Sequence, residues 1–272
     1  MILFSLDGPR GAQDVRLLVA GRTVATIPAG TRSAPQDLPA TITVPIGGGD
    51  RVLAVDRHRA RVVIARSSGA RVELPARPVS AHVAAPAIAQ DLRDNCETAA
   101  LQVLLATTGV RVDQLTLQRE LPQSLPVNPR DSPSGVVWGD PDAGFVGRAD
   151  GTGPWGGFGV YPGPLADLAA RHGRRLRDLT GESPQEIYRT LLQGRAVMVW
   201  VGLGDGPYRD WIGPSGRPIR VNLNEHTVVL HGVRRDGSLA VVNVLKGTHE
   251  IWTRSRFEHA WGLLGRRALG PA

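Results

Sequence analysis

The sequence predicts an α+β fold, with a small all-β module over residues 1–80 and a second domain over residues 81–272. Two observations predict it. Short β-branched runs separated by turn residues fill the first part, and the pattern changes near residue 87 to a helical lobe followed by antiparallel strands. A length of 272 residues suits one or two domains.

The first 80 residues alternate between strand-like and turn-like segments. Residues 15–19, 41–44 and 52–55 are rich in β-branched side chains, and residues 47–50 carry the glycines and aspartate of a turn. This pattern predicts a small all-β module. The proline- and alanine-rich stretch 75–86 is expected to act as a linker.

The second domain begins with a helix and ends with a sheet. An apolar helical run starts near Cys96 and ends near Gly109, and Asp94 with Glu97 has the spacing of a capping box. The segment 122–163 is much longer than ordinary connections of about 4–6 residues, so we expect a functional loop. Further elements are expected at residues 164–171, after Ser183, and at 196–203, 227–233, 239–245 and 255–264.

The composition limits the classes of partner. The net charge of +7 comes almost wholly from scattered arginines, and no zinc-finger spacing or aromatic RNA-binding motif accompanies them, so no nucleic-acid partner is expected. No stretch approaches the ~20 apolar residues of a membrane span. The first residues lack the pattern of a signal peptide.

Cys96 is the only cysteine, which excludes an intrachain disulfide and a cysteine-based metal cage. The orphan N–H groups and the dipole at a helix start favour a thiolate, which would make Cys96 a nucleophile. The alternative is a small buried hydrophobic residue, which is common for free cysteine. No metal or cofactor is expected, because His249 and His259 lack the acidic support of a metal site.

Three other residues complete a candidate constellation. Gln90, six residues before Cys96, could donate its amide to an oxyanion. His226 begins an apolar strand and could act as a base, although a histidine at a strand end is more often structural. Asn243 lies in the following strand, where it could orient the imidazole or satisfy a backbone group. His231 is five residues beyond His226 and belongs on the opposite face.

The order and spacing of these residues resemble a known family. The segment from about residue 87 to 269 is similar to the double-glycine leader peptidase-like proteins, family thirty-nine of the cysteine peptidases in the papain-like clan. The matching segments are residues 90–105, 144–147, 159–161 with 164–165, 194–200, 225–232, 241–247 and 257–265. The resemblance implies a papain-like domain with Cys96 and His226 as the catalytic pair and Gln90 in the oxyanion hole.

Two residues depart from the family pattern. Asn243 stands where the family usually has aspartate. Papain-type enzymes have asparagine at the corresponding position. Glu97 stands where the family typically has glycine, and a carboxylate beside Cys96 disfavours the thiolate unless it points outwards. The function expected is a cysteine peptidase-like hydrolase that cleaves a peptide or amide bond through an acyl-enzyme. The alternatives are a catalytically inactive papain-like domain that binds peptides or surfaces, and an acyltransferase with the same triad.

The substrate expected from the resemblance is a peptide or protein, and Trp138 and Trp155 in the long loop are candidates to line its groove. The other tryptophans are expected to pack in the core. The resemblance also suggests a location outside the cytoplasm. The sequence does not specify the cleavage sequence or the oligomeric state.

Overall fold

A computed structural model describes residues 80–234 and 236–272, together with the backbone of eight strands between Leu3 and Pro78. The chain divides into two compact units, one of residues 1–81 with 233–238, and one of residues 82–232 with 239–272. The domain boundary near residue 80 stays a prediction. In the described residues, no helix is both long and apolar enough to cross a membrane.

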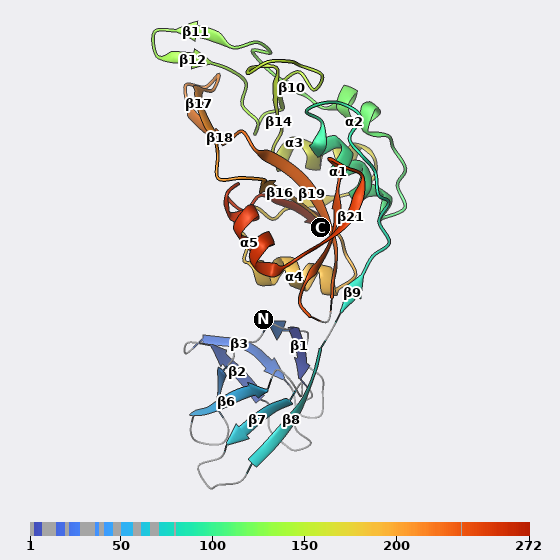
Figure 1. Cartoon of the computed structure of the whole chain (residues 1–272), viewed down its shortest axis with the longest axis vertical. Coiled ribbons are helices and arrows are strands. Elements are labelled where there is room, and N and C mark those ends of the chain that lie inside the picture. The colour runs from blue at the N-terminus through green and yellow to red at the C-terminus, as the bar shows by residue number, and fades with distance from the viewer. Residues whose placement is uncertain are drawn as a thin grey trace. The chain divides into compact units, whose positions relative to one another are not determined.

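The described elements of the first unit are strands (Figure 1). They form one eight-stranded sheet in the order β3-β2-β5-β6-β7-β8-β1-β4. The strands are β1 (Leu3–Leu6), β2 (Val15–Val19), β3 (Arg22–Ile27), β4 (Gln36–Asp37), β5 (Thr41–Pro45), β6 (Asp50–Asp56), β7 (Arg61–Ala65) and β8 (Arg71–Pro78). The expected linker 75–86 is wrong in its first part, because β8 continues to Pro78 and β9 (Ala81–His82) follows.

The second unit is built around a seven-stranded sheet. Its strands run in the order β15-β22-β16-β19-β20-β21, and β9 pairs with β19. Neighbouring strands whose register is known, such as Val201 opposite His226, are antiparallel. The strands are β15 (Leu176–Asp178), β16 (Val197–Gly202), β19 (Glu225–Val233), β20 (Leu239–Asn243), β21 (Thr248–Trp252) and β22 (Ala268–Pro271). The expected hairpin around Asp236 and Gly237 is confirmed, because β19 and β20 are neighbours.

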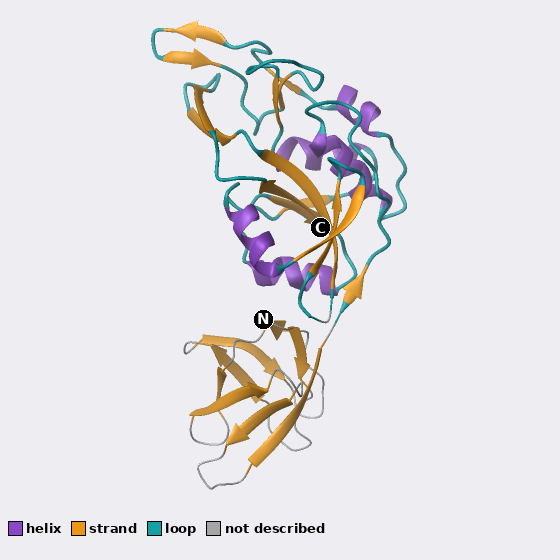
Figure 2. Cartoon of the chain, in the orientation of Figure 1, coloured by secondary structure: helices purple, strands orange, loops and turns teal. Residues whose placement is uncertain are grey.

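Helices cover both faces of this sheet (Figure 2). Met198 and Trp200 of β16 belong to the same buried core as helix α1, and the alternate residues Val197, Val199 and Val201 are also fully buried. A strand that is buried on both faces reads as a continuous apolar run. The helices are α1 (Cys96–Ala106), α2 (Gln114–Glu120), α3 (Pro162–Arg171), α4 (Pro184–Leu192) and α5 (Arg254–Gly262).

Local sequence explains where the helices begin. The Ser183 Oγ accepts a hydrogen bond from the Glu186 N–H at 3.3 Å, and Pro184 occupies the first turn of α4, as expected. Helix α1 begins differently. Asn95 precedes it without a side-chain capping bond, so the capping box expected from Asp94 and Glu97 is wrong. Glu97 makes its hydrogen bonds elsewhere, as described below.

The long segment 122–163 contains short strands instead of one loop. It holds β10 (Gln123–Ser124), β11 (Arg130–Ser132), β12 (Gly135–Val137), β13 (Phe145–Gly147) and β14 (Gly157–Gly159). β11 and β12 join the unpredicted hairpin β17 (Tyr208–Ile212) and β18 (Pro218–Asn222) in a four-stranded sheet. Trp138 and Trp211 form the buried centre of this part, with ring centroids 5.2 Å apart.

Candidate active site

Cys96 is the first residue of helix α1 and is 6% exposed. Asn95 fixes this start, because its Oδ1 accepts the Leu92 N–H at 2.9 Å and its Nδ2 donates to Gln114 Oε1 at 2.8 Å. The Cys96 N–H lies in the first turn of α1, where the backbone N–H groups have no carbonyl partner within the helix. The local fold therefore places both the sulfur and a free donor at the positive end of the helix.

The Glu97 carboxylate turns inward. Its Oε1 accepts the Val160 N–H at 2.7 Å, and its Oε2 lies 3.4 Å from Cys96 Sγ. Burial raises the pKa of Glu97 to about 7, even though hydrogen bonds from Val160 and Cys96 oppose the rise. The outward, capping orientation of Glu97 is therefore not the one adopted.

A second carboxylate, that of Glu225, also lies beside the sulfur. Its Oε2 is 4.0 Å from Cys96 Sγ, and its Oε1 is buried without a hydrogen-bond partner. Burial and the charge of Glu97 raise the pKa of Glu225 well above its usual value. Burial, then Glu225 and Glu97, raise the pKa of the Cys96 thiol, while hydrogen bonding by Thr227 acts in the opposite direction. At neutral pH the resting group is a thiol.

His226 and Asn243 meet across strands β19 and β20. His226 Nε2 lies 3.0 Å from Asn243 Oδ1, and Asn243 Nδ2 donates to Glu250 Oε1 at 2.8 Å. Glu250 Oε2 in turn accepts the Trp252 indole N–H at 2.7 Å. Because Asn243 must donate to the Glu250 carboxylate, its oxygen faces the imidazole. His226 Nε2 therefore carries a proton, and Nδ1 keeps the lone pair that a base needs.

The charge states in this relay follow from burial. Burial lowers the pKa of His226 to about 4, although the hydrogen bond that His226 donates to Asn243 and the charge of Glu250 act to raise it. Burial acts to raise the pKa of Glu250. Hydrogen bonds from Trp252 and Asn243 to its carboxylate outweigh burial and hold this pKa below its usual value. Near pH 7 the relay consists of a neutral imidazole, an amide and an ionised carboxylate.

Cys96 and His226 line the same cavity of about 150 Å³. Strand alternation places Glu225 and Thr227 on the face of Val229, which packs in the core with α1, and places His226 on the other face. Cys96 Sγ contacts Glu225, on the face of β19 that packs against α1. Cys96 and His226 are both described, and no hydrogen bond joins Cys96 Sγ to the His226 ring. A shift of the sulfur or the ring is needed to bring the two into contact.

Gln90 lines this cavity, but its amide is engaged with the backbone. Its Nε2 donates to Leu92 O at 2.9 Å and to Arg93 O at 2.7 Å, and its Oε1 is buried without a partner. An amide nitrogen has two hydrogens, so both are used. An oxyanion could receive an N–H from Gln90 only after one of these bonds is released.

Trp138 and Trp155 do not lie in this cavity. Trp138 is 1% exposed, and its indole N–H donates to Val127 O at 2.7 Å. Trp155 packs against Trp138 with ring centroids 5.2 Å apart and lies under Arg209. Trp138 is fully buried, whereas Trp155 is partly exposed. A role for these residues in substrate binding stays a prediction. Phe158 is the aromatic residue of the long segment that lines the cavity.

Two more features bear on ligands. Ligand atoms of Cys96, Glu97 and Glu225 lie within 4.8 Å of one another, so this set could hold a divalent cation.

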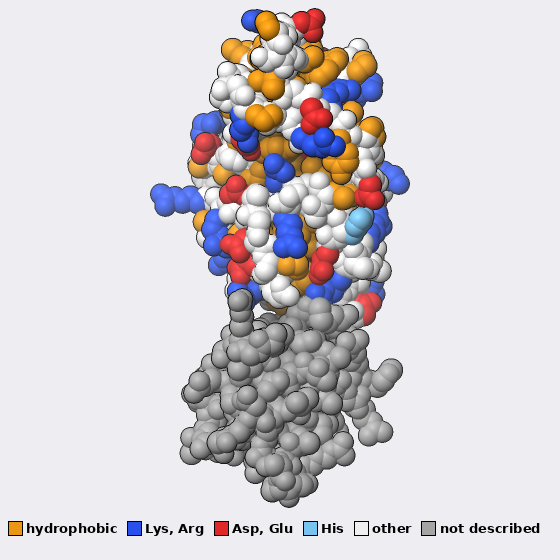
Figure 3. Space-filling view, turned by 90° about the vertical axis from the view of Figure 1, so that its left-hand side faces the viewer, with side chains coloured by type: hydrophobic (Ala, Val, Ile, Leu, Met, Phe, Trp, Pro, Cys, Tyr) orange, Lys and Arg blue, Asp and Glu red, His pale blue; other side chains and the backbone are white. Residues whose placement is uncertain are grey.

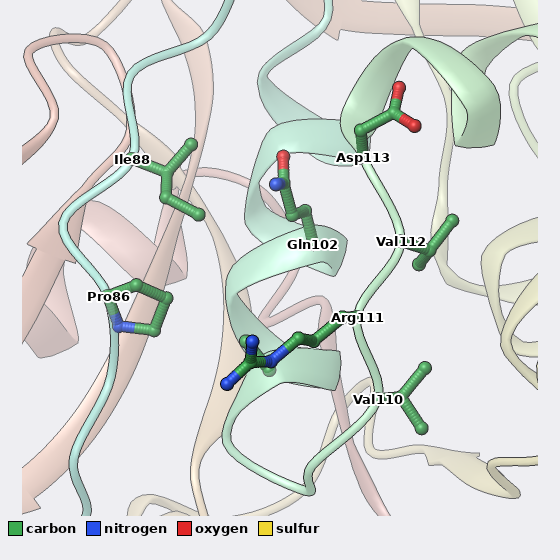
Figure 4. Close-up of a pocket in the computed structure, with 8 residues that line it drawn as sticks. Pro86, Ile88, Gln102, Val110, Arg111, Val112 and Asp113 are labelled. Atoms are coloured by element: carbon green, nitrogen blue, oxygen red, sulfur yellow. The ribbon is translucent and has the colours of Figure 1, made fainter.

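A larger cavity of about 600 Å³ lies beside helix α1 (Figure 4), where Pro86 and Ile88 face Gln102 and Arg111. None of the described residues that line it is a cysteine, serine or histidine. On the face drawn in Figure 3, Lys and Arg side chains are scattered among other side chains. The absence of a nucleic-acid partner stays a prediction.

Sequence reasoning missed Glu225 and Glu250. Glu225 precedes the candidate base, and strand alternation alone predicts that it points away from His226. Only the packing of α1 against β19 shows that it meets Cys96. Glu250 lies in an exposed strand, and its role depends on the Val241–Glu250 register between β20 and β21. No local signal in the sequence indicates either contact.

Comparisons with known proteins identify the family. The model of the Peptidase_C39 like family matches residues 82–269, which include all the residues of the candidate site. The chain belongs to this family. The uncharacterised protein YvpB of Bacillus subtilis (strain 168) is 32% identical over 183 residues, covering 65% of this chain and 69% of YvpB.

A solved structure agrees with the fold. The crystal structure described as a C39-like peptidase from Bacillus anthracis matches with a TM-score of 0.61 and 29% identity, over 71% of this chain and 98% of that one. The predicted papain-like α+β fold and the predicted family are thus confirmed. Membership of the Peptidase_C39 like family supports a peptidase-like function.

Proposed function

We propose that this chain is a cysteine peptidase in which Cys96 is the nucleophile, His226 the base and Asn243 the residue that orients the base. The contact between His226 Nε2 and Asn243 Oδ1 at 3.0 Å carries this proposal. It fixes the tautomer that leaves Nδ1 free, in a cavity that also contains the thiol at a helix start.

The resting charges favour general-base catalysis over a preformed ion pair. The pKa of the Cys96 thiol is raised and that of His226 is lowered to about 4, so both are neutral at pH 7. His226 Nδ1 accepts the thiol proton as sulfur attacks the carbonyl carbon, and it then passes the proton to the leaving amine. Water, deprotonated by the same nitrogen, releases the acid and restores the thiol.

The developing oxyanion needs donors in this cavity. The Cys96 N–H at the start of α1 is one, and the Gln90 amide is a second once it exchanges a backbone carbonyl for the oxyanion. We infer that substrate binding drives this exchange. A preorganised donor typically contributes about 10²–10³ in kcat, and the carbonyl bond that Gln90 must first release makes its contribution smaller.

The surface around the cavity suits a peptide or protein substrate. Leu203, Leu223 and Leu245 line the cavity and are 50%, 37% and 48% exposed. Large apolar side chains that gather at one exposed place are typical of interaction sites. A polypeptide can place apolar side chains on these leucines and its backbone beside Cys96.

Alkylation of Cys96 tests the proposal, because the chain has no other cysteine. The rate with iodoacetamide is measured by intact mass from pH 5 to pH 10 for the wild type, His226→Ala and His172→Ala. His172 is the matched control, because it contacts Glu120 outside the cavity. We expect His226→Ala to slow alkylation at pH 7 at least tenfold and His172→Ala to leave it unchanged. Equal rates in all three proteins would exclude His226 as the base.

One observation favours a second candidate, a catalytically inactive domain that binds peptides. The thiol contacts two carboxylates, Glu97 and Glu225, in place of the imidazole. In that case alkylation follows the raised pKa of the isolated thiol and does not depend on His226. Incubation with a mixture of unselected peptides, followed by mass spectrometry, separates hydrolysis from binding alone. An acyltransferase would instead join an added amine to the peptide.

A further inference from the structure

Three histidine side chains meet on the sheet of the second unit, and none of them lines the cavity beside Cys96. His82 ends strand β9, His231 lies on β19 and His249 lies on β21. The ring centroids of His82 and His231 are 4.7 Å apart, and those of His231 and His249 are 5.1 Å apart. His231 is buried, while His82 and His249 are exposed to solvent.

The strands explain why these rings share a face. His231 is two residues beyond Val229, so alternation places both on the same face of β19. His249 is paired with Val242, which belongs to the same buried core as Val229. His82 reaches this face because Val83, the next residue, donates its N–H to the His231 carbonyl at 2.8 Å.

The backbone fixes the tautomer of the central ring. His231 Nδ1 lies 2.9 Å from the carbonyl oxygen of Val83. A carbonyl oxygen only accepts, so Nδ1 carries the proton and Nε2 keeps a lone pair. Histidines that bind metals almost always use their other ring nitrogen in this way. Burial, with a smaller effect of the neighbouring rings, lowers the pKa of His231, which keeps it in the neutral form.

The lone pair of His231 points to a second ring nitrogen. Nε2 lies 3.4 Å from His249 Nδ1. This is a long hydrogen bond between the two rings, compared with ~2.7–3.2 Å for N–H···O bonds in proteins. The separation matches two nitrogens bound to one tetrahedral Zn²⁺, which are ~3.3–3.4 Å apart when each Zn–N bond is about 2.0–2.1 Å.

We propose that His82, His231 and His249 form a binding site for a divalent metal ion of the Zn²⁺ class. His231 and His249 already have the spacing of two ligands. The exposed His82 side chain becomes the third ligand after a rotation, and water takes the fourth position. Such an ion joins β9, where the second unit begins, to β19 and β21. The site is separate from peptide hydrolysis and does not depend on that function.

Zinc titration of the untagged full chain tests this site. Every protein carries Cys96→Ser, because Cys96, Glu97 and Glu225 also place ligand atoms within 4.8 Å of one another. Calorimetry at pH 7.5 is expected to give one Zn²⁺ per chain. We expect His249→Ala, at an exposed position, to weaken binding at least tenfold. His259→Ala is the matched control, because His259 is exposed and contacts Asp205 instead.

Two further readouts separate a metal site from a loss of folding. Thermal unfolding is expected to shift to higher temperature with Zn²⁺ in the Cys96→Ser and His259→Ala proteins, and not in His249→Ala. Co²⁺ is expected to give the intense visible absorption of tetrahedral coordination. Absence of one-to-one binding, or equal affinity in His249→Ala, would overturn the proposal. Unchanged affinity in His82→Ala would overturn the role of the third ligand.

Discussion

The side chain at position 243 illustrates how one atom pair decides a residue type. Asn243 presents its oxygen to His226 and its nitrogen to Glu250, at 3.0 Å and 2.8 Å. Aspartate, which the resemblance leads one to expect here, has no nitrogen to donate. It would place two carboxylates in contact without a hydrogen between them, which raises the pKa of one of them. Glu250 therefore explains the asparagine.

This contact gives a prediction for Asn243→Asp. The variant is expected to lower the His226-dependent alkylation rate of Cys96 at pH 7 by tenfold or more, because repulsion from Glu250 displaces the group that orients the ring. The double variant Asn243→Asp with Glu250→Gln restores a donor and is expected to recover most of the rate. A double variant as slow as the single one would show that Glu250 is not the cause.

Strand β14 gives a second prediction, at the level of one element. Gly159 has φ = +135°, and a Cβ there would collide with Glu97 Oε1. Gly153 has φ = +81°, and a Cβ added there would have no atom within 4 Å. Gly153→Ala is therefore the matched control. Both alanine variants carry backbone strain, which costs about 1 kcal/mol or more.

Only Gly159→Ala also displaces the Glu97 carboxylate. We expect urea unfolding to show that Gly159→Ala lowers the free energy of unfolding by ~1–3 kcal/mol more than Gly153→Ala does, because this is the usual cost of overpacking. If the two variants lose the same free energy of unfolding, the Glu97 carboxylate is not held against β14 in solution.

The elements also show how far the sequence predicts this fold. Helix α1, the Ser183-capped helix α4 and the β19–β20 hairpin follow from periodicity, capping residues and the Asp236-Gly237 turn. The short strands between residues 122 and 163 do not. Each has two or three residues, too few for a period to be visible. Some of their pairings also join distant segments, such as Gln123 with Phe145 and Val137 with Ile212.

The candidate site divides in the same way. Cys96, His226 and Asn243 could be proposed from their order and their positions on a helix and two neighbouring strands. The burial of Glu97 and the approach of Glu225 to the sulfur could not, because both depend on packing between α1, β14 and β19. Tertiary contacts of this kind leave no period or spacing in the sequence.

For the whole molecule, the buried acids around Cys96 set how stability depends on pH. Glu97 has a usual pKa of 4.5 and a folded-state pKa of about 7, so its contribution is full below 4.5 and is lost as pH rises through 7. His226 acts in the opposite direction, because its pKa falls from 6.5 to about 4 and its contribution is full only above 6.5. Above pH 6.5 the unfolded chain loses its remaining proton on His226, which opposes the change caused by the carboxylates mainly at the lower end of the range.

We therefore expect the free energy of unfolding to fall from pH 6.5 to pH 8. Each extra proton held by the folded state contributes a slope of up to about 1.4 kcal/mol per pH unit. Glu97→Gln is expected to flatten this fall, and Glu120→Gln, an exposed glutamate beside His172, is expected to leave it unchanged. Urea unfolding at each pH measures it. A slope that persists in Glu97→Gln would assign the protons to other groups.

The burial of Cys96 has a consequence for how the chain meets oxidants. Peroxide attacks an accessible thiolate, and Cys96 is 6% exposed with a raised pKa. As the only cysteine, it also has no resolving partner within the chain. The sulfur is therefore protected from sulfenic acid formation and from disulfide-linked dimers in air. We expect a preparation stored without reductant to retain its single thiol.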